Sequence, residues 1–82
     1  MLIGKIVGTV VSTRKHKELT GLKLLIVRPL NTRSPHQDLV AVDNIGAGVG
    51  EIVLVVLGNS ARLAIGNPQA PVDAAIVGIV DQ

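Results

Sequence analysis

The sequence predicts an all-β fold, a small five-stranded barrel with one short helix, and three observations support this fold class. Of the 82 residues, 48% are hydrophobic, nearly all of them are aliphatic, and Phe, Tyr and Trp are absent. Val and Ile, which branch at Cβ, favour strands over helices. The apolar residues fall in short runs bounded by Gly, Pro, Asn and Ser, a pattern typical of strands joined by turns. The length fits a single domain over residues 1–82.

The five strands are predicted over residues 2–12, 22–30, 38–43, 51–57 and 74–80. The first contains Gly4 and Gly8, at which a long strand can bend as a small barrel requires. The polar residues 13–21 are interpreted as a loop. Pro29 marks the end of the second strand because proline cannot donate to a ladder. Residues 31–37 contain Asn, Thr, Ser and Pro, which favour a turn before the third strand.

The connections on either side of the fourth strand differ in character. Residues 44–50 form a glycine-rich connection, whereas residues 58–66 are expected to form little more than one helical turn. Asn59 or Ser60 is expected to cap the start of this helix, and Gly66 to end it. Five strands and a short helix suggest an OB-like barrel, the architecture of oligonucleotide- and oligosaccharide-binding domains. A five-stranded open sandwich is the alternative.

Both faces of three predicted strands are apolar. In the strand at 51–57, the two faces carry Ile52, Leu54 and Val56, and Val53, Val55 and Leu57. An antiparallel sheet with one solvated face alternates apolar with polar residues instead. The barrel interior covers only one face, and one helical turn is too short to cover the other on three strands. The sequence therefore favours contact with another subunit over self-coverage, and predicts that Val55→Asp unfolds the chain or breaks the assembly.

Charge and composition exclude several function classes. The net charge of +2 is too small to indicate a nucleic-acid partner by itself, and the lack of cysteine excludes disulfides and thiolate chemistry. No apolar run approaches the roughly 18 residues of a membrane span. The N-terminus lacks the basic and apolar regions of a signal peptide. We expect a cytoplasmic protein.

The glycine-rich connection superficially matches a dinucleotide-binding fingerprint. Gly46, Gly48 and Gly50 have alternate spacing, but Glu51 stands where the fingerprint needs its last glycine. A strand follows rather than a helix, and no Walker-type lysine is present. We therefore interpret the connection as a turn that lets backbones approach closely.

No catalytic, cofactor or metal site is predicted elsewhere. His16 and His36 lack an obvious third ligand, and no serine stands beside a plausible base. Asp43 and Glu51 flank the glycine-rich connection, where an ion pair or a turn hydrogen bond is favoured over catalysis. The basic run at 14–17 is interpreted as a surface hairpin tip.

Several segments carry a family resemblance: VAVDNIGAGVGE at 40–51, VLV at 53–55, GNSAR at 58–62, PVDAAIVGIVD at 71–81, GTVVST at 8–13 and LTGLKLL at 19–25. Together they cover nearly the whole chain in order. In this combination the sequence resembles the vertex protein family of bacterial microcompartment shells, which includes the ethanolamine-utilisation and carboxysome pentamers.

The resemblance implies a homopentamer of small barrels, shaped as a truncated pyramid, that fills the vertices of an icosahedral shell. Hexameric and trimeric shell proteins tile the rest of that shell, which encloses enzymes, while the vertex protein catalyses no reaction. The resemblance also implies contacts with neighbouring shell proteins through Asn59, Ser60, Ala61 and Arg62. Serine is commoner than asparagine in the family at position 59. The loop from Gly46 to Gly50 is a candidate for subunit contact or the five-fold axis.

Two points stay open at this level. Arg62 is expected either to bind across a seam between proteins or to pair within the chain with Asp43, Glu51 or Asp73. The alternative to a shell protein is an OB-like module that binds nucleic acid or sugar, against which the missing aromatic residues weigh. A gel-shift assay with single-stranded DNA at moderate salt separates these functions, and tight binding would contradict the structural one.

Overall fold

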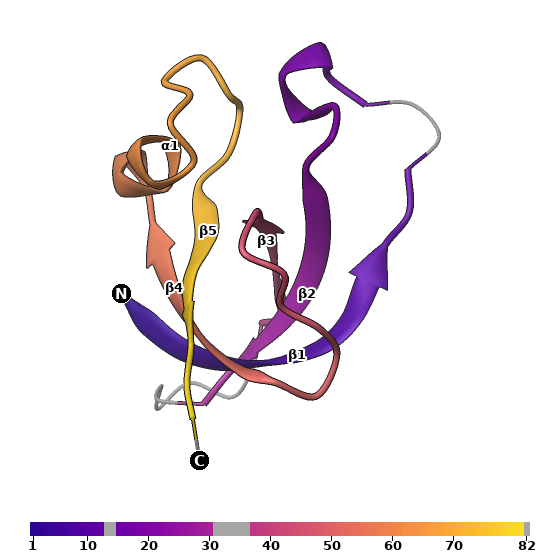
Figure 1. Ribbon diagram of the computed structural model, residues 1–82, viewed down its shortest axis with the longest axis vertical. Coiled ribbons are helices and arrows are strands. Elements are labelled where there is room, and N and C mark those ends of the chain that lie inside the picture. Colours follow the sequence, from indigo (N-terminus) through magenta and orange to yellow (C-terminus); the bar gives the residue numbers. More distant parts are fainter. Residues whose placement is uncertain (13–14, 31–36, 82) are drawn as a thin grey trace.

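The computed structural model describes residues 1–12, 15–30 and 37–81. In chain order, and as drawn in Figure 1, the elements within these residues are β1 (Leu2–Val10), the 3-10 helix η1 (Lys17–Leu19), β2 (Lys23–Pro29), β3 (Leu39–Asp43), β4 (Ile52–Leu57), α1 (Asn59–Ala64) and β5 (Ala74–Ile79). Each predicted strand and the predicted helix are present. Arg14, His36 and the predicted turn up to residue 36 lie outside the described residues.

The five strands close into a barrel in the order β1–β2–β3–β5–β4. The nine-residue strand β1 pairs antiparallel with both β2 and β4. A parallel contact between β3 and β5, at Val42 and Ala75, completes the circle. This closure confirms the barrel and excludes the open sandwich. Because every strand has a neighbour on each side, the faces and loops of the barrel are the main surfaces that a partner can contact.

The strand β1 bends around the barrel at its glycines, as predicted. A Cβ atom at Gly4 would overlap the side chain of Val27 on β2, so the two strands approach more closely than another residue would allow. The register between these strands shifts between Ile6 and Gly8. The strand ends at Val10, two residues before the predicted end, and the side chain of Val11 is 89% exposed.

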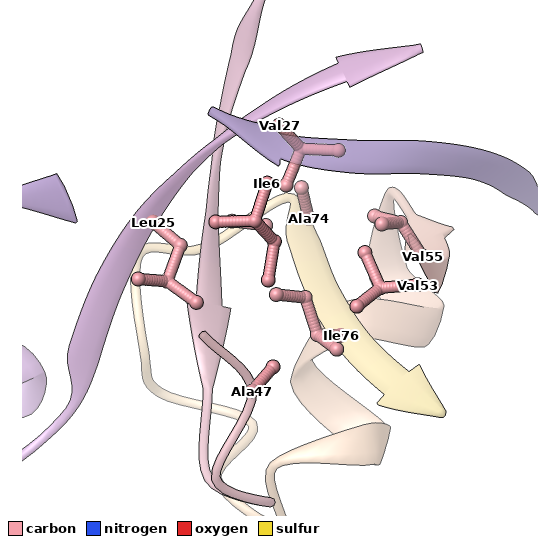
Figure 2. Packing of buried hydrophobic residues seen from close by; sticks show 9 residues of the cluster. Ile6, Leu25, Val27, Ala47, Val53, Val55, Ala74 and Ile76 are labelled. Carbon is pink, nitrogen blue, oxygen red and sulfur yellow. The ribbon is translucent and has the colours of Figure 1, made fainter. Parts of the chain in front are cut away.

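Aliphatic side chains from all the strands and from the loop after β3 fill the barrel interior. The buried cluster consists of Ile6, Leu25, Val27, Ala41, Ala47, Val53, Val55, Ala74 and Ile76. Figure 2 shows these side chains converging between the strands. On β4, Val53 and Val55 are both 0% exposed, as expected for one face of an alternating strand. Val55 therefore faces the barrel interior, and substituting it tests folding rather than assembly.

A second buried cluster lies on the outside of the barrel. Val42 on β3 and Ala75 on β5 pack with Ala61 of α1 and with Ala70 and Val72 in the segment that follows the helix. The expectation that another subunit, rather than the chain itself, covers the outer face of the last strand is thus wrong for the part of β5 at Ala75. The helix alone is short, but the segment between α1 and β5 extends its cover.

The start of α1 differs from the prediction. The N-cap is Gly58, and no side chain caps the helix, so neither Asn59 nor Ser60 has the expected role. Gly58 has φ +67, a conformation that glycine adopts without a Cβ penalty, because the chain turns sharply there from β4 into the helix. The predicted end is confirmed, since Gly66 follows the C-cap residue Ile65 with φ +71.

Candidate subunit and shell contact surfaces

Neither a cluster of metal ligands nor a membrane-spanning helix is found among the described residues. No three His, Cys, Asp or Glu side chains lie together as metal ligands in ranges 1–12, 15–30 and 37–81. No helix in the same ranges is long and apolar enough to cross a membrane.

Two carboxylates hold the glycine-rich connection by its backbone. Asp43 is 3% exposed, and its two carboxylate oxygens accept hydrogen bonds from the N–H groups of Ile45 at 2.9 Å and Ala47 at 2.8 Å. Oε1 of Glu51 accepts a hydrogen bond from the N–H of Gly48 at 2.6 Å. Asp43 and Glu51 thus make turn hydrogen bonds, which was one of the two predicted alternatives.

The same connection is fixed to the barrel from a second side. Nζ of Lys23 on β2 donates to the carbonyl of Ala47 at 2.6 Å, and the Ala47 side chain is buried in the interior cluster. The connection consequently presents Ile45 and Val49, which are 45% and 60% exposed. Two of the candidate glycines, Gly46 and Gly50, have φ +93.

Arg62 on α1 is bonded within the chain, but to none of the three expected carboxylates. Its Nε donates to the carbonyl of Ala70 at 3.1 Å, and its Nη1 donates to Oδ1 of Asn59 at 2.9 Å. Arginine carries five N–H donors, and the Nη2 group has no partner among the described residues. The guanidinium is therefore positioned by α1 and the segment after it, with donors left for a second molecule.

The remaining residues of α1 divide between cover and surface. Ala61 is fully buried in the outer cluster, whereas Ser60 is exposed. Leu63 is 77% exposed and was not singled out by the sequence. The spacing of Ala61 and Ile65, four residues apart on the packed side of the turn, is the signal that would have placed Leu63 on the outside.

The two groups of candidate residues do not come together. The helix α1 contacts β4 and β5, and Figure 1 shows the glycine-rich connection running from β3 to β4 elsewhere on the barrel. Asn59–Arg62 and Gly46–Gly50 therefore belong to separate surfaces.

Polar contacts outside these regions hold surface segments in place. Nδ2 of Asn67 donates to Oε2 of Glu18 at 2.8 Å, which ties η1 to the segment after α1. Arg28 binds Asp38 through two hydrogen bonds of 3.0 Å, and this carboxylate raises the pKa of Arg28. The latter pair lies on the exposed end of β2.

An apolar groove opens between η1 and the segment that enters β5. It has a volume of about 200 Å³ and is lined by Leu19, Leu24, Val40, Val42, Pro71, Val72, Asp73 and Ala74. Val40 is 49% exposed there. Local sequence patterns do not indicate the groove, because its lining combines residues near 19–24, 40–42 and 71–74.

The chain matches the family model described as "Ethanolamine utilisation protein EutN/carboxysome" over residues 1–81. It is 49% identical to the bacterial microcompartment shell vertex protein GrpN of Rhodospirillum rubrum, covering 99% of this chain and 93% of GrpN. It is 48% identical to the carboxysome shell vertex protein CcmL of Synechocystis sp., covering 99% of this chain and 83% of CcmL.

Solved structures agree with these sequence matches. An ethanolamine utilization protein EutN superposes with a TM-score of 0.91 at 44% identity, covering 100% of this chain and 88% of that one. The GrpN structure, described as a pentameric microcompartment shell protein, gives a TM-score of 0.83 at 49% identity and covers 100% of this chain and 94% of that one.

Proposed function

The chain belongs to the EutN/CcmL family of ethanolamine-utilisation and carboxysome proteins, and from this we propose that it is a structural vertex protein of a bacterial microcompartment shell. The observation that carries the proposal is the match along nearly the whole chain, in sequence and in fold, to proteins named as shell vertex proteins. We propose that residues 1–82 act as a single domain, in the cytoplasm and without enzymatic activity.

We propose further that the chain forms a homopentamer. The solved GrpN relative is described as pentameric, and it aligns with the whole of this chain. Aliphatic side chains that remain exposed on the isolated barrel, including Val40, Val77 and Val49, are consistent with a surface that other copies cover. Head-to-tail contacts between copies close into a ring when the rotation between neighbours fits.

Native mass spectrometry of the purified chain tests the pentamer directly. The expected result is a dominant species with five times the mass of the chain, which has 82 residues. A monomer at micromolar concentration would count against both the ring and the vertex function.

We propose that α1 makes the contact with hexameric and trimeric shell proteins. Arg62 retains unpaired donors, and the neighbouring Leu63 is 77% exposed on a helix whose other side is packed against the barrel. Arginine presents planar donors suited to backbone or carboxylate acceptors, while a rim leucine adds apolar contact.

Co-expression with a hexameric shell protein tests this assignment. Leu63→Ser is expected to lower the fraction of pentamer that co-purifies with shell fragments, while the native mass of the pentamer stays unchanged. Thr9→Ser, at another exposed position, serves as the matched control and is expected to co-purify normally. Equal co-purification of both variants would remove Leu63 from the contact.

A further inference from the structure

Two unlike apolar surfaces lie on different sides of the barrel. One is the groove described above, over the outer faces of β2 and β3. The other, here called the bulge patch, consists of Ile3, Leu54, Val77 and Gly78 on β1, β4 and β5. Ile3 pairs with Leu54, and Leu54 pairs with Gly78, so these residues form one row across the three strands.

Val77 points out of the barrel. On β5, Ala74 and Ile76 belong to the interior cluster and Ala75 to the outer one, so the ordinary alternation of a strand places Val77 on the outer side. A β-bulge follows, because Ile76 pairs with Val55 and Gly78 pairs with Leu54, and it places Gly78 on the outer side beside Val77. Val77 is 38% exposed, whereas its neighbour Ile76 is 2% exposed.

Gly78 has no side chain, so no atoms project from the backbone directly beside Val77. A Cβ atom at Gly78 would lie 3.5 Å from Cδ1 of Leu54, so the leucine side chain lies against the glycine. The bulge patch is therefore a protruding aliphatic side chain with a flat apolar surround. That shape matches a concave partner.

The groove offers such a concave surface on the same molecule. Its floor consists of Leu24, Val40 and Val42, and Leu19 and Pro71 are among the residues that enclose it. A volume of about 200 Å³ exceeds the roughly 30 Å³ share of one water several-fold, so an aliphatic side chain fits. The predominantly aliphatic lining offers few hydrogen-bond partners to water, so an aliphatic occupant is favoured over solvent.

We propose that the bulge patch of one copy docks in the groove of the next, with Val77 entering beside Val40. This inference rests on the proposed pentamer and specifies its interface. Two different surfaces on one chain give a head-to-tail contact, which leaves an open row of copies with one free surface of each kind at its ends until the ring closes. A contact between like surfaces stops at a dimer instead, which does not fit a five-membered ring.

Cross-linking in mixed rings tests the interface, and the absence of cysteine from the chain makes it specific. One Cys-containing variant, Val40→Cys, is co-expressed with a second, Val77→Cys, which carries a tag that changes its size. The assembled protein is treated with a short bis-maleimide and separated on a denaturing gel. Because each chain has a single thiol, cross-links within a chain cannot form.

The expected product is a cross-linked dimer of one tagged and one untagged chain, with no dimer when either variant is assembled alone. Val40→Cys mixed with Ser60→Cys is the matched control and is expected to give no dimer. A dimer from Val77→Cys alone would show a like-with-like contact and overturn the proposal. A chain that is pentameric by native mass but gives no mixed dimer would overturn this interface and leave the proposed function standing. A chain that is monomeric by native mass would overturn both.

Discussion

Asp43 is the only charged side chain that is buried among the described residues. Its two oxygens accept two backbone hydrogen bonds from the glycine-rich connection, so its charge is satisfied without a basic partner. Burying a carboxylate costs free energy unless such bonds are made. Asp43 thus fixes the backbone at Ile45 and Ala47, in the connection that exposes Ile45 and Val49.

Asp43→Ala removes both acceptors and is expected to lower the free energy of unfolding by about 1–3 kcal/mol, because two loop N–H groups lose their partner. Urea denaturation followed by circular dichroism measures the change. Asp81→Ala, at an exposed position, is the control and is expected to lie within about 0.5 kcal/mol of the unsubstituted chain. Equal stability of the two variants would mean that the loop holds its shape without the carboxylate.

Substitutions of Val55 and Val77, two valines on neighbouring strands, test folding and assembly separately. Val55 is 0% exposed inside the barrel, and Val77 is 38% exposed on the bulge. Val55→Asp is expected to unfold the chain, because an unpaired charge would be buried. Val77→Asp is expected to keep the far-ultraviolet circular dichroism spectrum of the fold and to run as a smaller species in native mass spectrometry. A pentameric Val77→Asp protein would place the bulge outside the interface.

At the scale of elements, the strand β1 determines whether the barrel can close. It pairs with β2 and β4 and must curve between them. Gly4 lies where β1 approaches β2, and a Cβ atom there would overlap Val27. The glycine is thus required by packing between strands.

Gly4→Ala is expected to destabilise the fold by about 1–3 kcal/mol through overpacking against Val27. The matched control is Gly8→Ala on the same strand, where the added Cβ meets Cδ1 of Ile26 at 3.4 Å, an ordinary contact. The midpoint of urea unfolding is expected to fall clearly for the first variant and little for the second. Similar midpoints would show that β1 and β2 can separate to admit a methyl group.

The α1 helix, together with the segment after it, covers more of the outer barrel surface than the sequence predicted. Its six residues bury Ala61, and the residues that follow add Ala70 and Val72 to the same outer cluster. The hydrogen bond from Arg62 to the Ala70 carbonyl ties the two parts together. Helix and extended segment act as one lid over β3 and β5, which leaves the groove on one side and the bulge patch on the other.

At the scale of the whole molecule, a closed barrel of this size has little interior. A domain of about 80 residues buries a smaller fraction of its surface than a larger one, so contacts between copies in the proposed pentamer are expected to add to its stability. Among the described residues each strand has a neighbour on both sides, although β3 and β5 pair only at Val42 and Ala75. Side chains on the outer faces and loops are therefore the main surfaces for assembly.

The melting temperature is expected to rise with protein concentration, because a ring dissociates as it unfolds. Differential scanning fluorimetry with an external dye, over a hundredfold range of concentration, measures the trend. Val77→Asp is expected to abolish the dependence while retaining a cooperative transition. A melting temperature that is independent of concentration in the unsubstituted chain would argue that the copies do not stabilise one another.

The sequence by itself determined the positions of the strands and the helix, because local features encode them, whereas closure of the barrel depends on the long-range pairing of β3 with β5. Alternation in β4 identified the face with Val53 and Val55, and glycines and prolines marked the turns. Local patterns gave the wrong prediction at the start of α1. Helices commonly begin with a side-chain cap, but the turn from β4 requires the left-handed backbone of Gly58 at this position instead.

Only the tertiary structure decided which outer faces remain free. Residues 65–73 have no periodic pattern, so their cover of Val42 and Ala75 depends on where the barrel places them. The groove likewise combines Leu19, Val40 and Pro71, which lie far apart in the sequence. The bulge that places Gly78 beside Val77 on the outer side arises from the register between β4 and β5. Register and packing are long-range properties, and they turned a general excess of aliphatic residues into two defined surfaces.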